Sequence, residues 1–129
     1  MARRKAGGAG GLRVLVVEDE SLLAMLLEDM VTELGCRVVG PVGALSEALE
    51  IAKGSPPFDC AILDIDLHGV KAYPIADALA ERAIPFIFTT GYGREHLAGR
   101  FEDVPFLQKP FQISQLRDAI ERFYRPVDV

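Results

Sequence analysis

The sequence predicts an α/β domain built on a doubly wound, five-stranded parallel sheet. Two observations support this class: short apolar runs alternate with helix-like stretches from Leu12 to Tyr124, and the first run is apolar on both faces. Such a strand belongs to a parallel sheet covered by helices on each side. Right-handed crossovers then predict a (βα)5 domain with strand order 2-1-3-4-5, in which the first and third strands are neighbours.

The first half of the chain contains three of the five expected strands. Its expected elements, in order, are strand 12–17, helix 21–34, strand 36–39, helix 45–53 and strand 58–63. Apolar residues recur at helical spacing in both helices, and Gly35 and the 54–57 segment follow them. The 40–41 Gly-Pro pair is expected to close the second strand, and residues 66–69 to form a loop.

The second half continues the alternation. Its expected elements are helix 73–82, strand 84–89, a short last strand at 106–107 and a final helix with Ser114 as its N-cap. The stretch from Arg94 to Asp103 offers few apolar anchors, so the fourth helix is expected to be short or irregular.

Length and composition predict one domain that folds without disulfides. The chain has 129 residues and half of them are apolar, which suffices for a core of its own. Cys36 and Cys60 show no metal-ligand spacing and are interpreted as reduced core residues of a cytosolic protein. We expect residues 1–11 to be a flexible extension, 12–125 the domain and 126–129 a tail.

Charge and hydropathy narrow the choice of partners. The net charge is −5 although Arg3, Arg4 and Lys5 are all positive, so the rest of the chain is acidic. Nucleic acid needs a basic face and is not expected as a partner. No apolar stretch approaches the roughly 20 residues that span a bilayer, and no signal peptide is recognisable. A cytoplasmic protein without a membrane partner is therefore expected.

Polar side chains follow four of the expected strands. Glu18 and Asp19 follow the first strand, and Asp64 follows the third. Thr90 comes after the fourth apolar run, and Lys109 comes after the fifth. The carboxyl ends of parallel strands meet at one edge of a sheet, where ligands of such sheets bind. We therefore expect carboxylates, a hydroxyl and an ammonium group in one pocket.

Three carboxylates in one pocket require a counter-charge. Two of them about 4 Å apart repel by on the order of 4 kcal/mol at an effective dielectric of ~20. Hard oxygen donors favour Mg²⁺, which takes one or two carboxylates together with phosphate oxygens. A second interpretation stays open, in which Asp19 or Glu20 only caps the helix that begins near Ser21.

Asp64 is the candidate nucleophile. An ionised carboxylate in this place can attack phosphorus and form an acyl phosphate. Mg²⁺ and Lys109 would offset charge on the transferring group. Thr90 is preferred over Thr89 as the hydroxyl that contacts a phosphoryl oxygen, because Gly91 follows it and leaves room for close approach.

These residues resemble the receiver domain of bacterial two-component response regulators, over about residues 12–124. The resemblance implies a flavodoxin-like fold with Asp64 as phosphoacceptor. It also implies that Mg²⁺ is bound by Glu18, Asp19, Asp64 and the backbone carbonyl of Asp66.

The 85–93 segment is similar to the Phe-Ala-Thr-Gly motif of certain single-domain receivers, with Thr89 where Ala is usual. Phe106 stands where the family often has Tyr, so the resemblance implies a packing switch of Thr90 and Phe106 without the phenol hydroxyl. Leu67 and His68 replace the common Met-Pro pair.

The resemblance implies a single-domain response regulator in a phosphorelay. A histidine kinase or a histidine phosphotransfer protein would donate the phosphoryl group, and a downstream protein would read the result. The protein would not be an enzyme, although its own residues would catalyse phosphorylation and dephosphorylation of Asp64. A degenerate receiver that binds its partner constitutively is the alternative. Asp64-Ile65-Asp66 also resembles the nucleophile motif of haloacid-dehalogenase-like phosphatases, but there the acidic pair comes last.

Two further features receive modest roles. His68 is interpreted as loop surface near the entering phosphodonor, because it makes no metal-ligand spacing with His96. Arg117, Arg122 and Arg125 on the last helix are interpreted either as a partner surface or as a solvated face interleaved with acids.

Overall fold

The protein forms a five-stranded parallel sheet. The structure is a computed structural model and describes residues 11–54, 56–91, 101 and 103–123. The strands of this sheet are β1 (Arg13–Val17), β2 (Arg37–Val42), β3 (Cys60–Asp64), β6 (Phe86–Thr90) and β7 (Phe106–Gln108). Their order is β2-β1-β3-β6-β7, and all four pairings are parallel. Because β6 and β7 are the fourth and fifth strands of this sheet, the predicted order 2-1-3-4-5 is confirmed.

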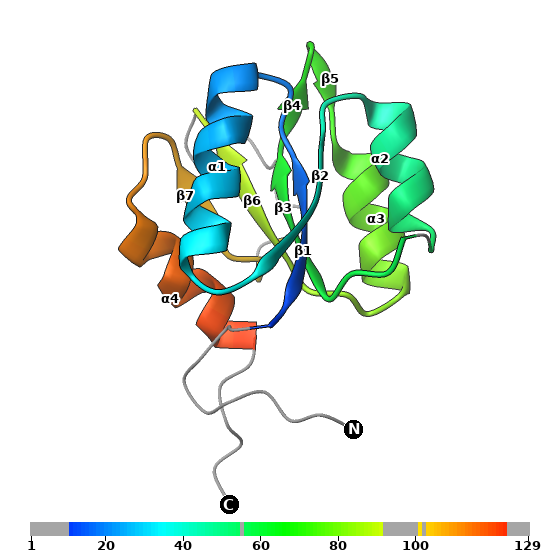
Figure 1. The fold of residues 1–129 in the computed structure, drawn as a ribbon. Coiled ribbons are helices and arrows are strands. Elements are labelled where there is room, and N and C mark those ends of the chain that lie inside the picture. Colours follow the sequence, from blue (N-terminus) through cyan, green and yellow to red (C-terminus); the bar gives the residue numbers. More distant parts are fainter. Residues whose placement is uncertain (1–10, 55, 92–100, 102, 124–129) are drawn as a thin grey trace, which may run out of the picture.

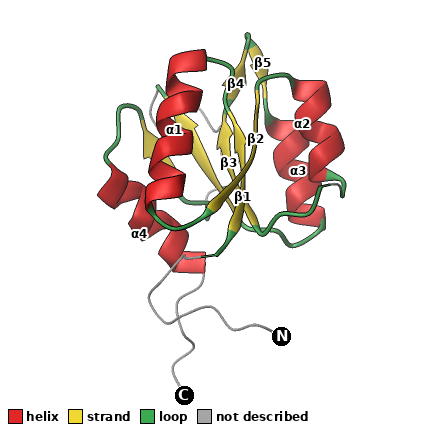
Figure 2. Ribbon diagram, viewed as in Figure 1, coloured by secondary structure: helices red, strands yellow, loops and turns green. Residues whose placement is uncertain are grey.

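Helices cover both faces of the sheet (Figures 1 and 2). They are α1 (Ser21–Glu33), α2 (Leu45–Ala52), α3 (Tyr73–Glu81) and α4 (Ile113–Phe123). α1 and α4 pack on one face, and α2 and α3 on the other. Among the described residues, no helix combines the length and the apolar character that crossing a bilayer requires.

The core consists of two apolar layers, one on each side of the sheet. The central strand β3 contributes to both, because Ile62 packs with the residues of α1 and α4 while Leu63 packs with those of α2 and α3. Every residue of β3 is buried. This double burial explains why the central runs are apolar throughout rather than alternating.

Aromatic rings fill the layer next to α3. Phe88 meets Phe86 and Phe101 edge-on, each at a centroid distance of 5.4 Å, and Tyr73 lies 5.9 Å from Phe101. Such tilted and edge-on pairs add to the stability that area burial alone provides.

The second strand extends further than the sequence suggested. Gly40 and Pro41 were expected to end it, but β2 continues through them to Val42, which pairs with Val17 after an irregularity in the ladder. The backbone N–H of Glu18 donates to the carbonyl of Val42 at 2.9 Å. Proline is tolerated because β2 is an edge strand, where one N–H per residue faces away from the ladder.

The prediction of a loop at 66–69 is wrong, because residues 66–71 form a β-hairpin. β4 (Asp66–Leu67) pairs antiparallel with β5 (Val70–Lys71). The two connecting residues, His68 and Gly69, have φ values of 52° and 82°. Positive φ at both central residues is characteristic of the type I′ turn, which suits a two-residue hairpin loop. Strands of two residues are too short to show alternation in a sequence.

The last helix begins one residue before its expected N-cap. Ser114 lies inside α4, so its prediction as the N-cap is wrong. The side chain of Gln115 reaches back instead, and its Oε1 accepts the backbone N–H of Gln112 at 2.8 Å. This bond satisfies one backbone donor at the start of the helix, as in the return half of a capping box.

Several expectations lie outside the described residues. They are the extension before Gly11, most of the irregular fourth helix, and the tail from residue 124 onward. Gly11 itself was counted in the extension, and its N–H donates to the carbonyl of Gly35 at 2.8 Å. The boundaries at residues 12 and 125 stay predictions.

Truncation of Leu63 to alanine should test the central position of β3. Leu63 is fully buried, whereas Leu22 on α1 is 80% exposed. Leu22→Ala is therefore the matched control for Leu63→Ala. We expect Leu63→Ala to lower the free energy of unfolding by about 3 kcal/mol, and Leu22→Ala by less than about 0.5 kcal/mol. Urea denaturation followed by circular dichroism measures both. Similar losses in the two variants would contradict the packing described here.

Candidate functional site

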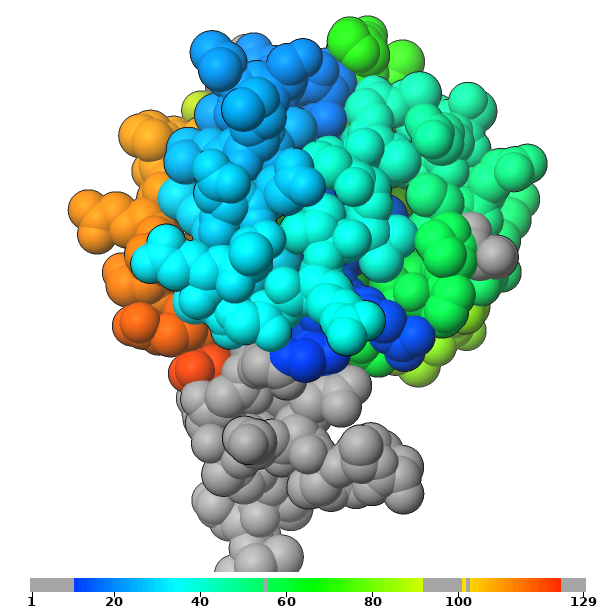
Figure 3. All heavy atoms as spheres, viewed as in Figure 1, coloured from blue at the N-terminus to red at the C-terminus, as the bar shows by residue number. Residues whose placement is uncertain are grey.

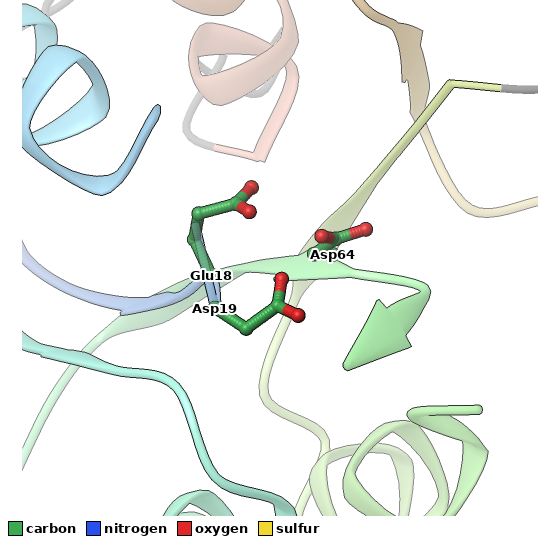
Figure 4. Close-up of side chains that lie close together, drawn as sticks. All are labelled: Glu18, Asp19 and Asp64. Atoms are coloured by element: carbon green, nitrogen blue, oxygen red, sulfur yellow. The ribbon is translucent and has the colours of Figure 1, made fainter. Parts of the chain in front are cut away.

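Three carboxylates converge at the carboxyl edge of the sheet. Glu18 and Asp19 follow β1, and Asp64 is the last residue of β3. β1 and β3 are adjacent and in register, with Val17 opposite Leu63. Figure 4 shows the carboxylates of Glu18 and Asp19 extending toward Asp64. One oxygen from each of the three lies within 4.8 Å of the others, which confirms the predicted acidic cluster.

Lys109 supplies one positive charge to this cluster. Its Nζ lies 3.0 Å from Glu18 Oε1 and 3.1 Å from Asp64 Oδ2, so it bridges the two buried carboxylates. Burial alone would lower the pKa of Lys109, but these contacts outweigh it and the pKa is raised above its ordinary value. The lysine therefore stays protonated. The sequence placed Lys109 at this edge, and only the structure shows that it joins Glu18 to Asp64.

Asp64 is held in an unfavourable environment. Only 5% of the residue is exposed. Burial and the charge of Glu18 together raise the pKa of Asp64 to about 7, although Lys109 and the N–H of Asp66 act in the opposite direction. Burial is the largest of these effects, because it removes the water that would stabilise the ionised carboxylate. The carboxylate would gain from an additional cation.

A divalent cation fits the donors of this pocket. Three carboxylates face one ammonium group, so negative charge remains uncompensated. Glu18 is 3% exposed, and its Oε1 has no aligned hydrogen bond despite the ion pair with Lys109. A buried oxygen in this state is costly unless something else coordinates it. Hard oxygen donors of this kind are the ligands of Mg²⁺.

Asp19 lies on the open side of the cluster, beneath the β4–β5 hairpin. Its Oδ2 accepts the backbone N–H of His68 at 2.8 Å and lies 3.4 Å from His68 Nδ1. Burial alone would raise the pKa of Asp19, but the contacts with His68 bring it below its ordinary value. Asp19 is therefore ionised at neutral pH. His68 was expected to be loop surface, and its ring is indeed exposed, but its backbone forms part of the site.

The open pocket at this edge has a volume of about 330 Å³. Asp19, Asp64, Asp66, His68 and Lys109 line it together with two glycines and Glu20. The N–H of Asp66 donates to Asp64 Oδ1 at 3.2 Å, and the Asp66 side chain pairs with Lys71 at 2.7 Å. The side chain of Asp66 is thus engaged outside the cluster, which is consistent with a role for its backbone carbonyl.

The two threonines of β6 lie on opposite faces of the sheet. Ile87 packs against α1 and α4 and Phe88 against α3, so strand alternation puts Thr89 on the first face and Thr90 on the second. Both threonines are buried. Thr89 lies opposite Asp64 in register and its hydroxyl has no hydrogen-bond partner. The preference for Thr90 stays a prediction.

Phe106 lies on the same face as Thr90. It pairs in register with Phe88 and packs, half-buried, against the core next to α3. Thr90 is two residues further along β6, opposite Gln108. The structure therefore puts the two proposed switch residues on one face of neighbouring strands.

Gly43 is a residue of the site that the sequence analysis missed, because it lets the backbone pass close to the acidic pair. It follows β2, and a Cβ added to it would lie 3.2 Å from Asp19 Cα and 3.3 Å from the carbonyl oxygen of Glu18. These separations are tighter than ordinary van der Waals contact, so a side chain would press on the backbone that carries the acidic pair. The only signal in the sequence was a glycine after an expected strand. Because turns commonly contain glycine, that signal did not point to a close approach.

Comparisons with known proteins agree with this geometry. A family model described as the response regulator receiver domain matches residues 14–121. The transcriptional regulatory protein PdtaR of Mycobacterium tuberculosis is 36% identical over 113 residues, which cover 84% of this chain and 55% of PdtaR. The phyllosphere-induced regulator PhyR of Methylorubrum extorquens is 33% identical over 126 residues, covering 94% of this chain and 46% of PhyR.

A solved structure is similar over most of its length as well. The solution structure of SdrG from Sphingomonas melonis is 42% identical, has a TM-score of 0.76, and is matched over 85% of this chain and 93% of SdrG. By contrast, the chain spans about half the length of the two curated relatives. The Phe-Ala-Thr-Gly subgroup stays a prediction.

The raised pKa of Asp64 predicts how stability depends on pH without divalent cations. The folded protein binds a proton at Asp64 more tightly than the unfolded chain, so the unfolding free energy should fall as pH rises from about 4 to about 7. Asp64→Asn cannot ionise and removes this loss. We expect the unfolding free energy of Asp64→Asn to exceed that of the wild type by about 1–3 kcal/mol at pH 8 and by little at pH 4. Urea titrations with a chelator at several pH values measure the difference; a difference independent of pH would refute the assignment.

Proposed function

Because the chain belongs to the response regulator receiver domain family, we propose that it accepts a phosphoryl group on Asp64 from a histidine kinase or a histidine phosphotransfer protein. One observation carries the proposal. A buried carboxylate at the end of the central strand lies 3.1 Å from a lysine ammonium and within 4.8 Å of two further carboxylates. This constellation suits phosphoryl transfer to a carboxylate, because cations offset the charge that develops on the phosphoryl oxygens.

The transfer is a displacement at phosphorus. An oxygen of ionised Asp64 attacks the phosphorus of a phosphohistidine, the new O–P bond forms, and the N–P bond breaks with its electron pair passing to the imidazole nitrogen, which then takes a proton. Lys109 Nζ already lies 3.1 Å from Asp64 Oδ2 and offsets negative charge there. Thr90 donates its hydroxyl to a phosphoryl oxygen. Water then hydrolyses the acyl phosphate, which releases inorganic phosphate and restores the carboxylate.

Mg²⁺ is the cation that fits this pocket best. Glu18, Asp19, Asp64 and the backbone carbonyl of Asp66 would hold it, and it would neutralise charge on the carboxylates and the phosphoryl oxygens. The ion pair to Lys109 keeps Glu18 oriented toward Asp64. The contact with the hairpin keeps Asp19 ionised and therefore able to bind a cation.

The apolar surface of α1 is the proposed docking site for the phosphoryl donor. Leu22, Met25 and Leu26 are 80%, 59% and 49% exposed, an unusual set for one helix. Figure 3 shows α1 on the surface, next to the β4–β5 hairpin. A small apolar pocket of about 50 Å³ joins this helix to Phe111 and reaches Glu18 and Lys109. A donor seated there would present its phosphohistidine to Asp64.

Phosphorylation would act through the face of β6 and β7 that carries Thr90 and Phe106. A phosphoryl group adds nearly two negative charges at neutral pH and attracts hydroxyl and ammonium groups. Movement of Thr90 toward it would change the space in which Phe106 packs, since both residues lie on one face of adjacent strands. The output is then a change in protein binding. The solution structure of SdrG in its BeF3-activated conformation supports the proposal that phosphorylation changes the conformation of this chain.

Incubation with acetyl phosphate and Mg²⁺ tests the phosphoacceptor. We expect intact-protein mass spectrometry to show a gain of one phosphoryl group in the wild type and none in Asp64→Asn. Asp118→Asn, a surface change on α4, is the matched control and should be phosphorylated normally. An unmodified wild type, with partner binding independent of acetyl phosphate, would instead favour a constitutive binding module.

Paired substitutions separate the two threonines. Thr90→Ala should slow phosphorylation by acetyl phosphate about tenfold or more, because a hydrogen bond to a charged phosphoryl oxygen is lost. Thr89→Val should leave the rate within about twofold and raise the unfolding free energy by about 1 kcal/mol, because it removes a buried hydroxyl without a partner. Quench-flow mass spectrometry gives the rates. The reverse order of effects would assign the phosphoryl contact to Thr89.

A further inference from the structure

We propose that His68 provides a nitrogen ligand at the acidic pocket, so that the site binds divalent transition-metal ions such as Co²⁺ more tightly than an all-oxygen site would. The inference rests on the metal site of the proposed function and adds one residue to it. It concerns which cation the pocket prefers, and not whether Asp64 accepts a phosphoryl group.

The hairpin fixes the backbone of His68 at the mouth of the pocket. Leu67, the preceding residue, is 2% exposed and belongs to the core next to α3. The N–H of Ala72 donates to the carbonyl of Ile65 at 2.7 Å and closes the base of the hairpin. Lys71 pairs with Asp66 at 2.7 Å across the two short strands. With its tip also bonded to Asp19, the hairpin has little freedom to carry His68 away.

The imidazole lies at a separation from Asp19 that suits shared coordination. His68 Nδ1 is 3.4 Å from Asp19 Oδ2, and His68 and Asp19 both line the 330 Å³ pocket. Two donors that bind one ion at about 2.1 Å each, at a tetrahedral angle, are themselves about 3.4 Å apart. The existing geometry therefore needs little adjustment for Nδ1 and Asp19 to bind the same ion.

The His68 side chain is free to take either of two roles. It is 72% exposed, so no packing fixes the ring. Without a cation, a proton on Nδ1 lets the ring pair with Asp19. As a ligand the neutral ring presents the Nδ1 lone pair, and the proton is carried on Nε2 instead. No other covalent change is required: a neutral ring only moves its proton from Nδ1 to Nε2, and a protonated ring releases one proton to solvent when the ion binds.

A nitrogen ligand changes the selectivity of the pocket. Carboxylate, carbonyl and water oxygens suit Mg²⁺, whereas imidazole suits cobalt, nickel, copper and zinc. An imidazole beside Asp19 should therefore strengthen binding of these metals in the pocket while changing Mg²⁺ binding little. A purely structural His68 would orient Asp19 through hydrogen bonds and affect all cations alike.

His68→Asn is the decisive variant. Asparagine tolerates the φ of 52° at this position and keeps the backbone N–H that binds Asp19, so it removes the imidazole and preserves the turn. We expect the affinity for Co²⁺ to fall about tenfold in His68→Asn and the affinity for Mg²⁺ to change less than about twofold. Isothermal titration calorimetry with each metal alone gives both numbers. In the wild type, Co²⁺ should also shift the ring-proton NMR signals of His68 strongly, and Mg²⁺ should not.

The controls separate this inference from the proposed function. Asp64→Asn should weaken both metals, which establishes that they occupy this pocket. Asp118→Asn, the surface change on α4, should bind both metals as the wild type does and still gain one phosphoryl group from acetyl phosphate with Mg²⁺. Equal losses for Co²⁺ and Mg²⁺ in His68→Asn, or no loss for either, would overturn the role of His68 as a ligand while leaving the phosphoacceptor intact. Failure of Mg²⁺-dependent phosphorylation in the wild type would instead contradict the proposed function.

Discussion

The bridge from Lys109 to Glu18 and Asp64 is the interaction on which the rest of this site depends. Three carboxylates meet at the edge of one sheet, and two of them are almost completely buried. The lysine ammonium lies about 3 Å from both buried carboxylates and offsets only part of their repulsion. The folded protein therefore holds an acidic pocket that is partly neutralised, and this incomplete neutralisation is what makes a cation and a phosphoryl group suitable ligands.

The surroundings of the pocket divide it into a buried side and an open side. Glu18 and Lys109 lie on the buried side, next to apolar residues of α1 and to Phe111. Asp19 lies on the open side, where the β4–β5 hairpin donates a hydrogen bond to it. This division gives the carboxyls different pKa values, with Asp64 raised and Asp19 lowered. Groups of one chemical type thus acquire different roles through their environments.

The two faces of the sheet separate the proposed steps of signalling. The face covered by α1 and α4 carries the exposed apolar surface next to the acidic pocket. The other face carries the aromatic layer around Phe88, against which Phe106 packs. Asp64 is the last residue of β3, the strand at the centre of the sheet between these two faces. Because the chain spans about half of its curated relatives, its partners and its output belong to the proposal.

Sequence reasoning reached the fold and most of the acidic site. Apolar periodicity is a local property, so it located the five strands, and the rules for parallel sheets then brought Glu18, Asp19, Asp64 and Lys109 to one edge. The proposal that Asp64 accepts a phosphoryl group came from the chemistry of a carboxylate at this edge and from the family resemblance, not from periodicity. The sequence did not reveal the extension of β2 through Pro41 or the hairpin at 66–71, because their strands are irregular or too short to show a pattern.

By itself, then, the sequence determined that five strands form and that the polar residues lie at or just beyond the carboxyl ends of four of them, since a strand needs only its own apolar run and the break that follows it. The tertiary structure decided which of those residues touch. The bond from His68 to Asp19 joins positions 49 residues apart, and the close approach of Gly43 to Asp19 joins the segments that follow β2 and β1. Such contacts depend on how the whole sheet twists and packs, and no local pattern of residues records them.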